Sequence, residues 1–387
     1  MTISPLKPNL GVASQPHLNG LEEPKLPRVL HLIDSGGIYG IERMLLALLP
    51  ALQVLGYPVA LGCFGVPGTT GGAVGEAAAE LGVETLFFDF RSRTSLRGVA
   101  DVTQAIARSP RTILHFHGYK ATIIGGVASQ LFRRIRIATY HGEANQSVGL
   151  DRYIAIESPI IRRLHAVAAV SEPIAEELRM RGVAPGRVHV IPNGIPDPRV
   201  LHHSNTKTFT LAIIGRLIPE KNIHLLLQSV ATLRPAWPHL RVVIAGDGPY
   251  RLELERLAGE LNLTESVTFL GFVSDVPRLL AQADAFVMPS QTEGMPISLL
   301  EAMAVGVPII ASAVGSIPAV TRHLKEGLLI PPNDSRALVT AIELLLNDPA
   351  GAQSRAANAK ARFLGHFTSE AMARAYSSLY KYVSDER

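Results

Sequence analysis

From Arg28 onward, the chain alternates short apolar runs with stretches whose apolar residues recur at helical spacing. A short apolar run bounded by turn residues predicts a buried strand, and alternation of such strands with helices predicts a parallel sheet covered on both faces. Before residue 192 we predict seven strands, at Val29–Ile33, Val59–Phe64, Thr85–Phe88, Thr112–Phe116, Arg136–Tyr140, Ala166–Val170 and Val188–Ile191.

A polar segment at 192–207 interrupts the alternation and is typical of a linker. The alternation then resumes and predicts six more strands, at Phe209–Gly215, Val242–Ala245, Val267–Leu270, Ala285–Met288, Pro308–Ala311 and Gly327–Ile330. The predicted fold class is α/β, with two doubly wound domains in series. The expected parts are a flexible tail at 1–24, a first domain at 25–195, a second at 196–367 and a final helix at 368–387.

The composition fits a globular enzyme, because 387 residues with 47% hydrophobic side chains suffice for two cores. The single cysteine, Cys63, excludes an internal disulfide framework and indicates a reducing compartment. It falls in a predicted strand, so a buried core residue is a better interpretation than a nucleophile. Residues 1–20 lack the apolar segment of a secretory signal, and glycines and prolines interrupt the uncharged stretch 302–320. We expect a cytoplasmic protein, free or peripheral to the inner face of a membrane.

Positive charge is concentrated in the first half of the chain. Residues 1–195 hold 19 Lys and Arg against 15 Asp and Glu, whereas the remainder holds 18 of each. One hypothesis is attraction to an anionic membrane surface or a lipid-phosphate acceptor. A solvated basic face is at least as good an interpretation, because a net charge of +4 is modest for this length. No nucleic acid is expected as a partner. The clustered arginines are Arg91, Arg93, Arg97, Arg133, Arg134 and Arg136.

Two glutamates, Glu293 and Glu301, are separated by a loop that turns into a helix, in the segment E-G-M-P-I-S-L-L-E. In a continuous helix their spacing would correspond to a rise of about 12 Å, whereas paired glycosidase carboxylates lie about 5–10 Å apart. The spacing disfavours a hydrolytic acid–base pair and favours two acceptors at opposite ends of one hydroxyl-bearing ligand. Pro296 is predicted at the first helical position, and the free N–H groups of this helix start suit a phosphate. A sugar, a diphosphate and a ribose in that order describe a nucleotide sugar.

The E-x7-E segment, followed by A-M-A-x-G-x-P-I-I-A, resembles the retaining glycosyltransferases of the GT-B fold, group 1, family four. The resemblance covers about residues 27–385 and implies two Rossmann-like domains that face each other across a cleft. It also implies that a C-terminal helix at Ser369–Val383 crosses back onto the first domain. Four further motifs occur in the family's usual order, Ala169-Val170-Ser171, Val190-Ile191-Pro192-Asn193-Gly194, Gly215-Arg216 with Lys221-Asn222, and Gly246-Asp247-Gly248-Pro249.

This resemblance implies a donor site in the second domain. Arg216 and Lys221 would hold the donor diphosphate, where fixed cations stabilise the charge that builds up on the leaving group. Glu293 would contact the donor sugar, and Glu301 would accept hydrogen bonds from the ribose. The apolar neighbours of Glu301 agree, since a carboxylate among them needs partners. The other donor-binding residues implied are Gly248, Val273, Gly294, Met295, Pro296 and Ile297. The turn 246–249 is equally well explained as purely structural, and Asn193-Gly194 is expected to form a turn.

His141 closes a predicted strand, at a point where the family places a histidine near the reacting carbon. The implied catalytic residues are thus His141, Arg216, Lys221 and Glu293. A hydrogen-bonded histidine at a strand end is the alternative for His141. His115 and His117 close another strand, so a zinc site of three histidines has to be considered. We expect no metal site, because no cysteine is near and these two side chains are taken to point to opposite faces of the strand.

A glycine-containing segment, S-G-G-I-Y-G-I-E-R at 35–43, follows the first strand and precedes a helix predicted at Met44–Leu55. Such glycines permit close backbone approach to a phosphate or sugar, here on the acceptor side. The segment also raises an alternative, a dinucleotide-binding oxidoreductase. The spacing G-G-x-x-G and the lack of an acidic residue after the second strand disfavour it. The acceptor-side glycines are Gly36, Gly37 and Gly40.

The sequence therefore predicts a retaining glycosyltransferase that moves a sugar from a nucleoside-diphosphate sugar to a carbohydrate or lipid-linked acceptor, in polysaccharide or glycolipid assembly. No Asp-x-Asp motif is present, and Arg216 and Lys221 can replace a divalent metal at the diphosphate, so metal independence is expected. No cofactor is expected besides the nucleotide sugar as co-substrate. Two other classes stay open: a nucleotide-sugar epimerase or phosphorylase on a related fold, and a non-catalytic subunit that binds the nucleotide sugar.

Overall fold

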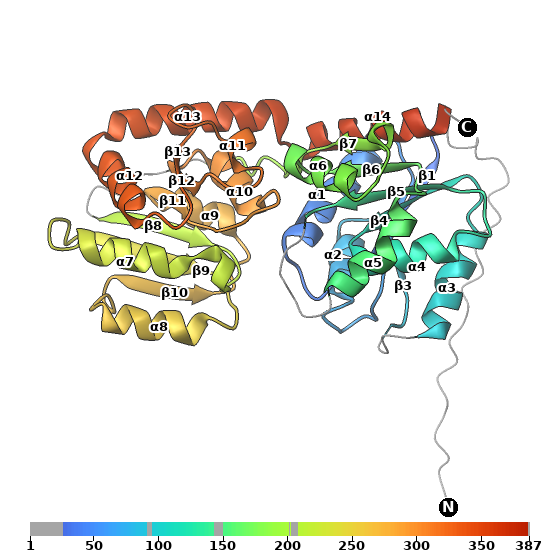
Figure 1. Cartoon of the computed structure of the whole chain (residues 1–387), viewed down its shortest axis with the longest axis horizontal. Helices are drawn as coiled ribbons and strands as arrows, with labels where there is room; N and C mark the ends of the chain where they lie inside the picture. Colours follow the sequence, from blue (N-terminus) through green and yellow to red (C-terminus); the bar gives the residue numbers. More distant parts are fainter. Residues whose placement is uncertain (1–25, 91–94, 143–149, 201, 203–207, 386–387) are drawn as a thin grey trace, which may run out of the picture.

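The computed structural model describes residues 26–90, 95–142, 150–200, 202 and 208–385. These residues form two lobes, each built on a parallel sheet flanked by helices (Figure 1). The first lobe contains the seven-stranded sheet and the second lobe the six-stranded sheet. The predicted α/β class with two doubly wound sheets is confirmed. The tail predicted at 1–24 lies outside the described residues.

All seven strands predicted for the first lobe are present, with ends within one residue of the prediction. Their order is β3-β2-β1-β4-β5-β6-β7, so the direction of strand addition reverses between β1 and β4. β2 and β4 are buried along their whole length, including the two histidines of β4. The strands are β1 Arg28–Ile33, β2 Val59–Cys63, β3 Glu84–Phe87, β4 Thr112–His117, β5 Ile135–Tyr140, β6 Ala166–Ala169 and β7 Val188–Val190.

The second sheet has the order β10-β9-β8-β11-β12-β13 and reverses between β8 and β11. Its six strands were also predicted, with ends that differ by at most two residues. They are β8 Phe209–Ile214, β9 Leu240–Ala245, β10 Val267–Gly271, β11 Ala285–Met288, β12 Ile309–Ser312 and β13 Leu328–Ile330.

Helices connect the strands and cover the sheets. Those of the first lobe are α1 Gly40–Val54, α2 Ala73–Glu80, α3 Leu96–Ala107, α4 Tyr119–Ala128, α5 Leu150–Ile161, α6 Glu172–Met180 and the 3-10 turn η1 Pro185–Arg187. The others are η2 Pro219–Lys221, α7 Ile223–Leu233, α8 Arg251–Glu260, α9 Val276–Ala281, α10 Ile297–Val305, α11 Ile317–Val320, α12 Ser335–Asn347, α13 Pro349–His366 and α14 Ser369–Asp385.

Helix α1 begins four residues earlier than predicted, at Gly40 instead of Met44. The carboxylate of Glu42 accepts a hydrogen bond from the backbone N–H of Tyr39, at 3.0 Å, and so satisfies a donor at the helix start. The glycine-containing segment is therefore shorter than expected, and Gly40 and Arg43 are helical residues.

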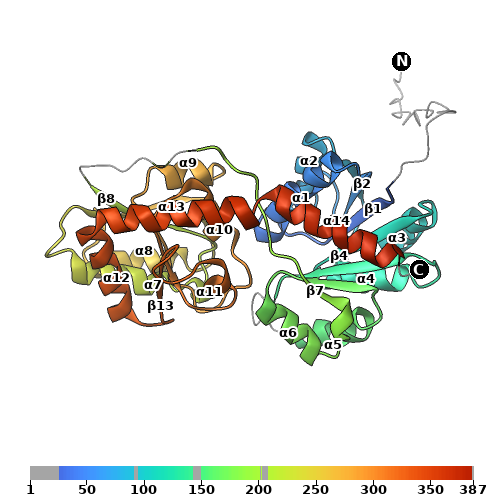
Figure 2. The same ribbon diagram turned by 90° about the horizontal axis from the view of Figure 1, so that it is seen from above.

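Helix α14 crosses back onto the first lobe, as the resemblance implied, and lies along α1 (Figure 2). Two tyrosines on its inner face form buried hydrogen bonds with the first sheet. Tyr380 Oη lies 2.8 Å from His115 Nδ1, and Tyr376 Oη lies 2.8 Å from Thr139 Oγ1. Each of these polar groups is buried with a partner, so the helix is held in one register as well as by its apolar contacts.

The segment between the lobes runs extended against the junction of α13 and α14. The N–H of Ile195 donates to Phe367 O at 3.0 Å, and the N–H of Ser369 donates to Ile195 O at 2.8 Å. The turn expected at Asn193-Gly194 is not observed. Gly194 is needed for close approach instead, since a Cβ there would lie 2.3 Å from the carbonyl oxygen of Thr368.

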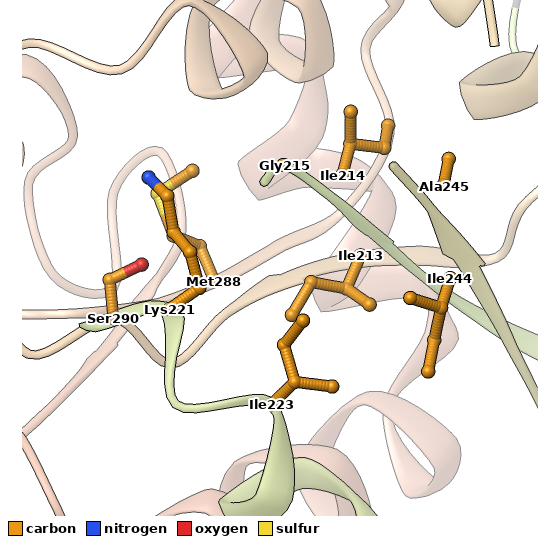
Figure 3. Close-up of a pocket in the computed structure, with 9 residues that line it drawn as sticks. All are labelled: Ile213, Ile214, Gly215, Lys221, Ile223, Ile244, Ala245, Met288 and Ser290. Atoms are coloured by element: carbon orange, nitrogen blue, oxygen red, sulfur yellow. The ribbon is translucent and has the colours of Figure 1, made fainter. Parts of the chain in front are cut away.

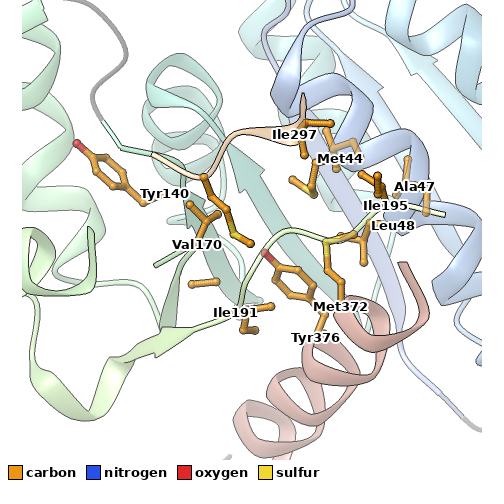
Figure 4. Close-up of a cluster of buried hydrophobic side chains, with 14 of the residues drawn as sticks. Met44, Ala47, Leu48, Tyr140, Val170, Ile191, Ile195, Ile297, Met372 and Tyr376 are labelled. Atoms are coloured by element: carbon orange, nitrogen blue, oxygen red, sulfur yellow. The ribbon is translucent and has the colours of Figure 1, made fainter. Parts of the chain in front are cut away.

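The buried core of the first lobe continues into the start of α10. Ile297 of α10 lies beside Met44 of α1, in a cluster that also contains Ile195 of the crossing segment and Met372 of α14 (Figure 4). Chain segments from both lobes therefore share one apolar core at the point where the lobes meet, and this contact fixes α10 relative to α1. Cys63 is fully buried in this core, and burial raises the pKa of its thiol to about 12, so the predicted structural role is confirmed.

Among the described residues, no helix combines the length and the apolar character needed to span a bilayer. Two of the clustered arginines, Arg91 and Arg93, lie outside the described residues. Arg134 has its guanidinium 5.8 Å from the centre of the Phe132 ring. Binding to an anionic membrane surface stays a prediction.

We expect Gly194→Ala to destabilise the protein by about 1–3 kcal/mol, because the new methyl group would overlap the Thr368 carbonyl. The measurement is the midpoint of thermal unfolding. Gly186→Ala is the matched control, since a Cβ at Gly186 meets no atom within 4 Å. Equal midpoints for the two variants would contradict the close packing of the crossing segment.

Candidate functional site

The second sheet reverses its order between β8 and β11, and ligands of open parallel sheets bind beyond the carboxyl ends of strands at such a point. β8 leads into Gly215 and the exposed Arg216, and β11 leads into the loop that precedes α10. The structure thus places the predicted donor-binding loops next to each other.

Lys221 and Glu293 form an ion pair between these loops, with 2.5 Å from Nζ to Oε1. The loops are tied together by the backbone, since the N–H of Gln291 donates to Glu220 O at 2.8 Å. Lys221 is followed by Asn222, whose left-handed backbone (φ +53°) ends η2 and starts α7. The side chain of Glu293 is only 8% exposed, so the pair is largely shielded from water.

The backbone of Gly315 packs directly against the backbone of Glu293. Its φ of +52° and the short distance of 1.7 Å between an added Cβ and the carbonyl oxygen of Glu293 leave room for glycine only. No feature of the sequence predicted this contact.

Glu301 lies on α10 and is buried. Its carboxylate accepts a hydrogen bond from Arg43 Nη1 of helix α1 at 2.7 Å, so the two lobes are joined by an ion pair. Burial raises the pKa of Glu301 to about 7, although the charge and hydrogen bond of Arg43 act in the opposite direction. The prediction that Glu301 needs a partner is confirmed, and in this structure the partner is a residue of the other lobe.

The backbone of the first lobe packs directly against the loop before α10. A Cβ at Gly294 would lie 2.3 Å from the carbonyl oxygen of His141, and one at Gly40 would lie 3.9 Å from Ile297. The Tyr39 ring is 5.9 Å from the guanidinium of Arg216. His141 and Gly40 are therefore brought to the same place as the donor-side residues. Among the described residues, no atom lies within 4 Å of a Cβ built on Gly36.

The start of α10 has no side-chain cap. Pro296 is the N-cap residue, and the first helical residue is Ile297, one position later than predicted. The preceding Met295 is buried, and its carbonyl accepts a hydrogen bond from Asn193 Nδ2 at 3.1 Å. Because no side chain occupies the N–H groups of this helix start, they are suited to an anion.

The turn 246–249 packs against the Arg216 loop. A Cβ at Gly246 would lie 1.8 Å from Gly215 O, and one at Gly248 would lie 2.4 Å from Leu217 O. These glycines hold the Arg216 loop in place, which supports the structural interpretation of the motif. Val273 is partly buried just after β10.

His141 follows β5 directly, and its Nε2 atom is buried without a partner among the described residues. Burial lowers the pKa of His141 to about 4, so the imidazole is neutral near pH 7. A neutral imidazole with a free nitrogen can donate a hydrogen bond to a ligand, or accept one from it, without adding a charge to the site.

Three buried histidines, His31, His115 and His117, meet in the first lobe. The zinc site considered from the sequence involved His141 in place of His31. His115 and His117 point to the same face of β4, because side chains two positions apart in a strand share a face; the expectation of opposite faces is wrong. His31 of β1 completes the set, and its Nδ1 lies 3.0 Å from His117 Nε2.

Nitrogen atoms of these three rings lie within 4.8 Å of one another, as a metal site would require. Both ring nitrogens of His115 already contact hydroxyl groups of α14 and β5, however, at 2.8 and 2.7 Å. A metal would have to displace one of these bonds. Burial lowers the pKa of all three histidines, which keeps them neutral, and His31 Nε2 and His117 Nδ1 are buried without a hydrogen-bond partner among the described residues. The expectation of no metal site stays a prediction.

A small pocket lies beside Lys221, at the carboxyl ends of β8, β9 and β11 (Figure 3). Its walls are mostly apolar, from Ile213, Ile223, Ile244 and Met288. Ser290 also lines it, and the buried hydroxyl of Ser290 has no partner among the described residues. The pocket therefore offers one free polar group next to the cation.

Sequence reasoning missed Arg43, Tyr39 and Asn193 as residues of this site. Arg43 and Tyr39 were visible only as neighbours of the predicted acceptor-side glycines. Asn193 was assigned to a turn, although a buried amide that contacts the donor loop is what the structure shows. Each of the three acts across the boundary between the lobes, where local sequence carries no signal.

Two family models match the chain: "Glycosyl transferases group 1" over residues 198–362, and "Glycosyltransferase Family 4" over residues 38–199. An exopolysaccharide phosphotransferase of Streptomyces coelicolor is 34% identical over 56% of this chain, but the match spans only 23% of that protein. A glycogen synthase of Mycobacterium tuberculosis is 28% identical, with coverage of 69% of this chain and 68% of that protein.

Among solved structures, HepE of Anabaena in complex with UDP-glucose superposes with a TM-score of 0.81. The two chains are 22% identical, and the superposition covers 92% of this chain and 100% of HepE. The likeness shows that the arrangement of two sheets is shared over nearly the whole chain.

We expect Arg43→Met to destabilise the protein by about 1–3 kcal/mol at about pH 8, because Glu301 would become a buried carboxylate without a cation. A carboxyl group whose pKa is raised on folding lowers stability above the folded pKa, and this cost disappears as the pH falls toward the unfolded pKa. The destabilisation measured by urea unfolding should therefore shrink toward about pH 5.

The double variant Arg43→Met/Glu301→Gln is the control, because it removes the buried charge and should recover part of the lost stability. An effect of Arg43→Met that is the same at both pH values would contradict the interlobe ion pair.

Proposed function

The chain belongs to the glycosyltransferases, and from this we propose that it transfers a sugar from a nucleoside diphosphate to a carbohydrate or lipid-linked acceptor with retention of configuration. The main observation behind the proposal is the arrangement of charged groups around helix α10. The ion pair of Lys221 and Glu293 lies just before the uncapped start of this helix, and the buried Glu301 is one of its residues. The UDP-glucose bound to HepE and the glycogen synthase among the relatives are consistent with a nucleotide-sugar donor.

We place the donor along this line of groups. The ribose hydroxyls would donate hydrogen bonds to Glu301 in place of, or together with, Arg43. The diphosphate would lie between Arg216, Lys221 and the N–H groups at the start of α10, and the sugar hydroxyls would reach Glu293. The free hydroxyl of Ser290 is next to Lys221 and is a further candidate contact.

In the proposed reaction the acceptor oxygen attacks the anomeric carbon from the side on which the diphosphate departs. The leaving diphosphate oxygen takes the proton of the acceptor hydroxyl, so no carboxylate nucleophile is required. Arg216 and Lys221 stabilise the departing diphosphate more strongly than the intact donor, because negative charge accumulates there as the bond breaks. Neutral His141, in contact with the donor loop, would position the donor sugar or the acceptor hydroxyl.

We expect Lys221→Met and Glu293→Gln each to lower the rate of sugar transfer by about 100-fold or more, because each removes a charged contact to the donor. The measurement starts with a thermal-shift screen of nucleoside-diphosphate sugars. A cognate donor at about 100 times its Kd should raise the free energy of unfolding by about 2.7 kcal/mol.

Transfer from that donor is then followed by product analysis with and without an acceptor, which separates a transferase from an epimerase or phosphorylase. Glu260→Gln is the matched control, since Glu260 pairs with Arg256 on the exposed surface of the same lobe. Full transfer activity in Glu293→Gln would show that the donor sugar is bound elsewhere.

We also expect transfer to be independent of divalent metals, because the two cations Arg216 and Lys221 are available at the diphosphate. Activity should stay within about twofold of its starting value after dialysis against EDTA. Complete loss of transfer on chelation, restored by manganese, would refute this part of the proposal.

A further inference from the structure

Both sheets reverse their strand order once, and the two reversals are equivalent positions in the two lobes. In the second lobe the reversal between β8 and β11 carries the proposed donor site. In the first lobe the reversal lies between β1 and β4, and loops at the carboxyl ends of these strands are expected to bind a ligand for the same topological reason.

An ion pair bridges this second reversal. Asp34 directly follows β1, and Lys120 lies just after β4, in the first turn of α4. Lys120 Nζ donates to Asp34 Oδ1 at 2.9 Å, and the two side chains are 25% and 36% exposed. The pair is thus fixed by the sheet and still open to a ligand.

The ammonium group of Lys120 also lies near two aromatic rings. Lys120 Nζ lies 5.1 Å from the ring centre of Phe90 and 5.9 Å from that of Phe64, and both rings are buried. A cation near ring faces is attracted by them, so these rings add to the contacts that hold Lys120 in place. The charge of Lys120 is already balanced by Asp34, and an anion would have to compete with that carboxylate.

The neighbouring His141 supplies an independent sign of a ligand. It follows β5, the strand next to β4, and its ring centre is 6.2 Å from that of His117 at the end of β4. Its Nε2 atom is buried without a partner among the described residues, while its carbonyl packs against Gly294 of the donor loop. His141 and the ion pair both lie at the carboxyl-terminal edge of the first sheet, beyond the ends of β5 and of β1 and β4.

We propose that Asp34 and Lys120 form the acceptor subsite, and that it binds a neutral, hydroxyl-bearing sugar. Asp34 accepts hydrogen bonds from its hydroxyl groups and Lys120 donates one, so that the acceptor is held with its reactive hydroxyl toward His141 and the donor sugar. The pair is suited to such a sugar because it offers both an acceptor and a donor at a net charge of zero. This inference rests on the proposed function and adds the chemical class of the acceptor.

The test uses matched acceptors that differ only at C6: octyl glucoside against octyl glucuronide, and octyl galactoside against octyl galacturonide. The wild-type protein should prefer the neutral member of a pair, as measured by the ratio of kcat/KM values. Asp34→Asn frees the Lys120 cation and should shift this ratio toward the uronide by about tenfold or more. Lys120→Gln leaves the carboxylate uncompensated and should shift the ratio the opposite way.

A ratio is used because a general loss of activity cancels in it. The controls are Arg28→Met and Glu84→Gln, which break a similar ion pair of 2.5 Å at the amino ends of β1 and β3, and they should leave the ratio unchanged. A preference for the uronide, no transfer to any neutral glycoside, or equal shifts in both variants would overturn the subsite assignment. Calorimetry with nucleotide sugars distinguishes a failure of the subsite assignment from a failure of the proposed function. A wild-type protein that binds none of these sugars would overturn the proposed function, and the inference with it.

Discussion

The two lobes are joined by an ion pair between a buried carboxylate of one lobe and a cation of the other. Glu301 is buried among the apolar residues of α10 and pairs with Arg43 of α1 at 2.7 Å. Burial outweighs the opposing charge and hydrogen bond of Arg43 and raises the pKa of Glu301 to about 7. The contact is possible only because α1, α10, α14 and the crossing segment share one core, which sets the two helices face to face.

The same principle holds for two other ion pairs. Lys221 is paired with Glu293, and Lys120 with Asp34, so these four charges are already balanced in the protein alone. A nucleotide sugar would exchange the contacts of Lys221 and Glu293 for its own phosphate and hydroxyl groups. The uncapped start of α10 and the free nitrogen of His141 are exceptions, and both lie next to the loop at Gly294. These two groups lie where the proposed reaction would need them.

The sequence predicted the elements well, because strand signals are local. All thirteen strands were expected within two residues of their ends, since each is a short apolar run between turn residues. The burial of Glu301 was also predictable from its apolar neighbours. The start of α1 was misplaced because the Glu42 carboxylate accepts a hydrogen bond from the N–H of Tyr39 and so allows the helix to begin at Gly40, despite the low helix propensity of glycine. The meeting of His31 with His115 and His117 depends on the register between β1 and β4, which no local pattern shows.

Contacts across the lobes were beyond sequence reasoning for the same physical reason. Arg43 and Glu301 are separated by 258 positions, and their pairing depends on how two separate sheets are placed by α14. Gly194 was assigned to a turn, although it is required by the close approach of Thr368. The roles of these residues depend on tertiary packing, which cannot be derived from composition or from the spacing of residues in the sequence.

The most direct measurement is a crystal structure of the protein with a nucleoside-diphosphate sugar that stabilises it. We expect ribose hydroxyls on Glu301, the diphosphate between Arg216, Lys221 and the start of α10, and the sugar beside Glu293. A nucleotide sugar bound away from these groups, with the ion pairs of Glu301 and Glu293 undisturbed, would contradict this expectation.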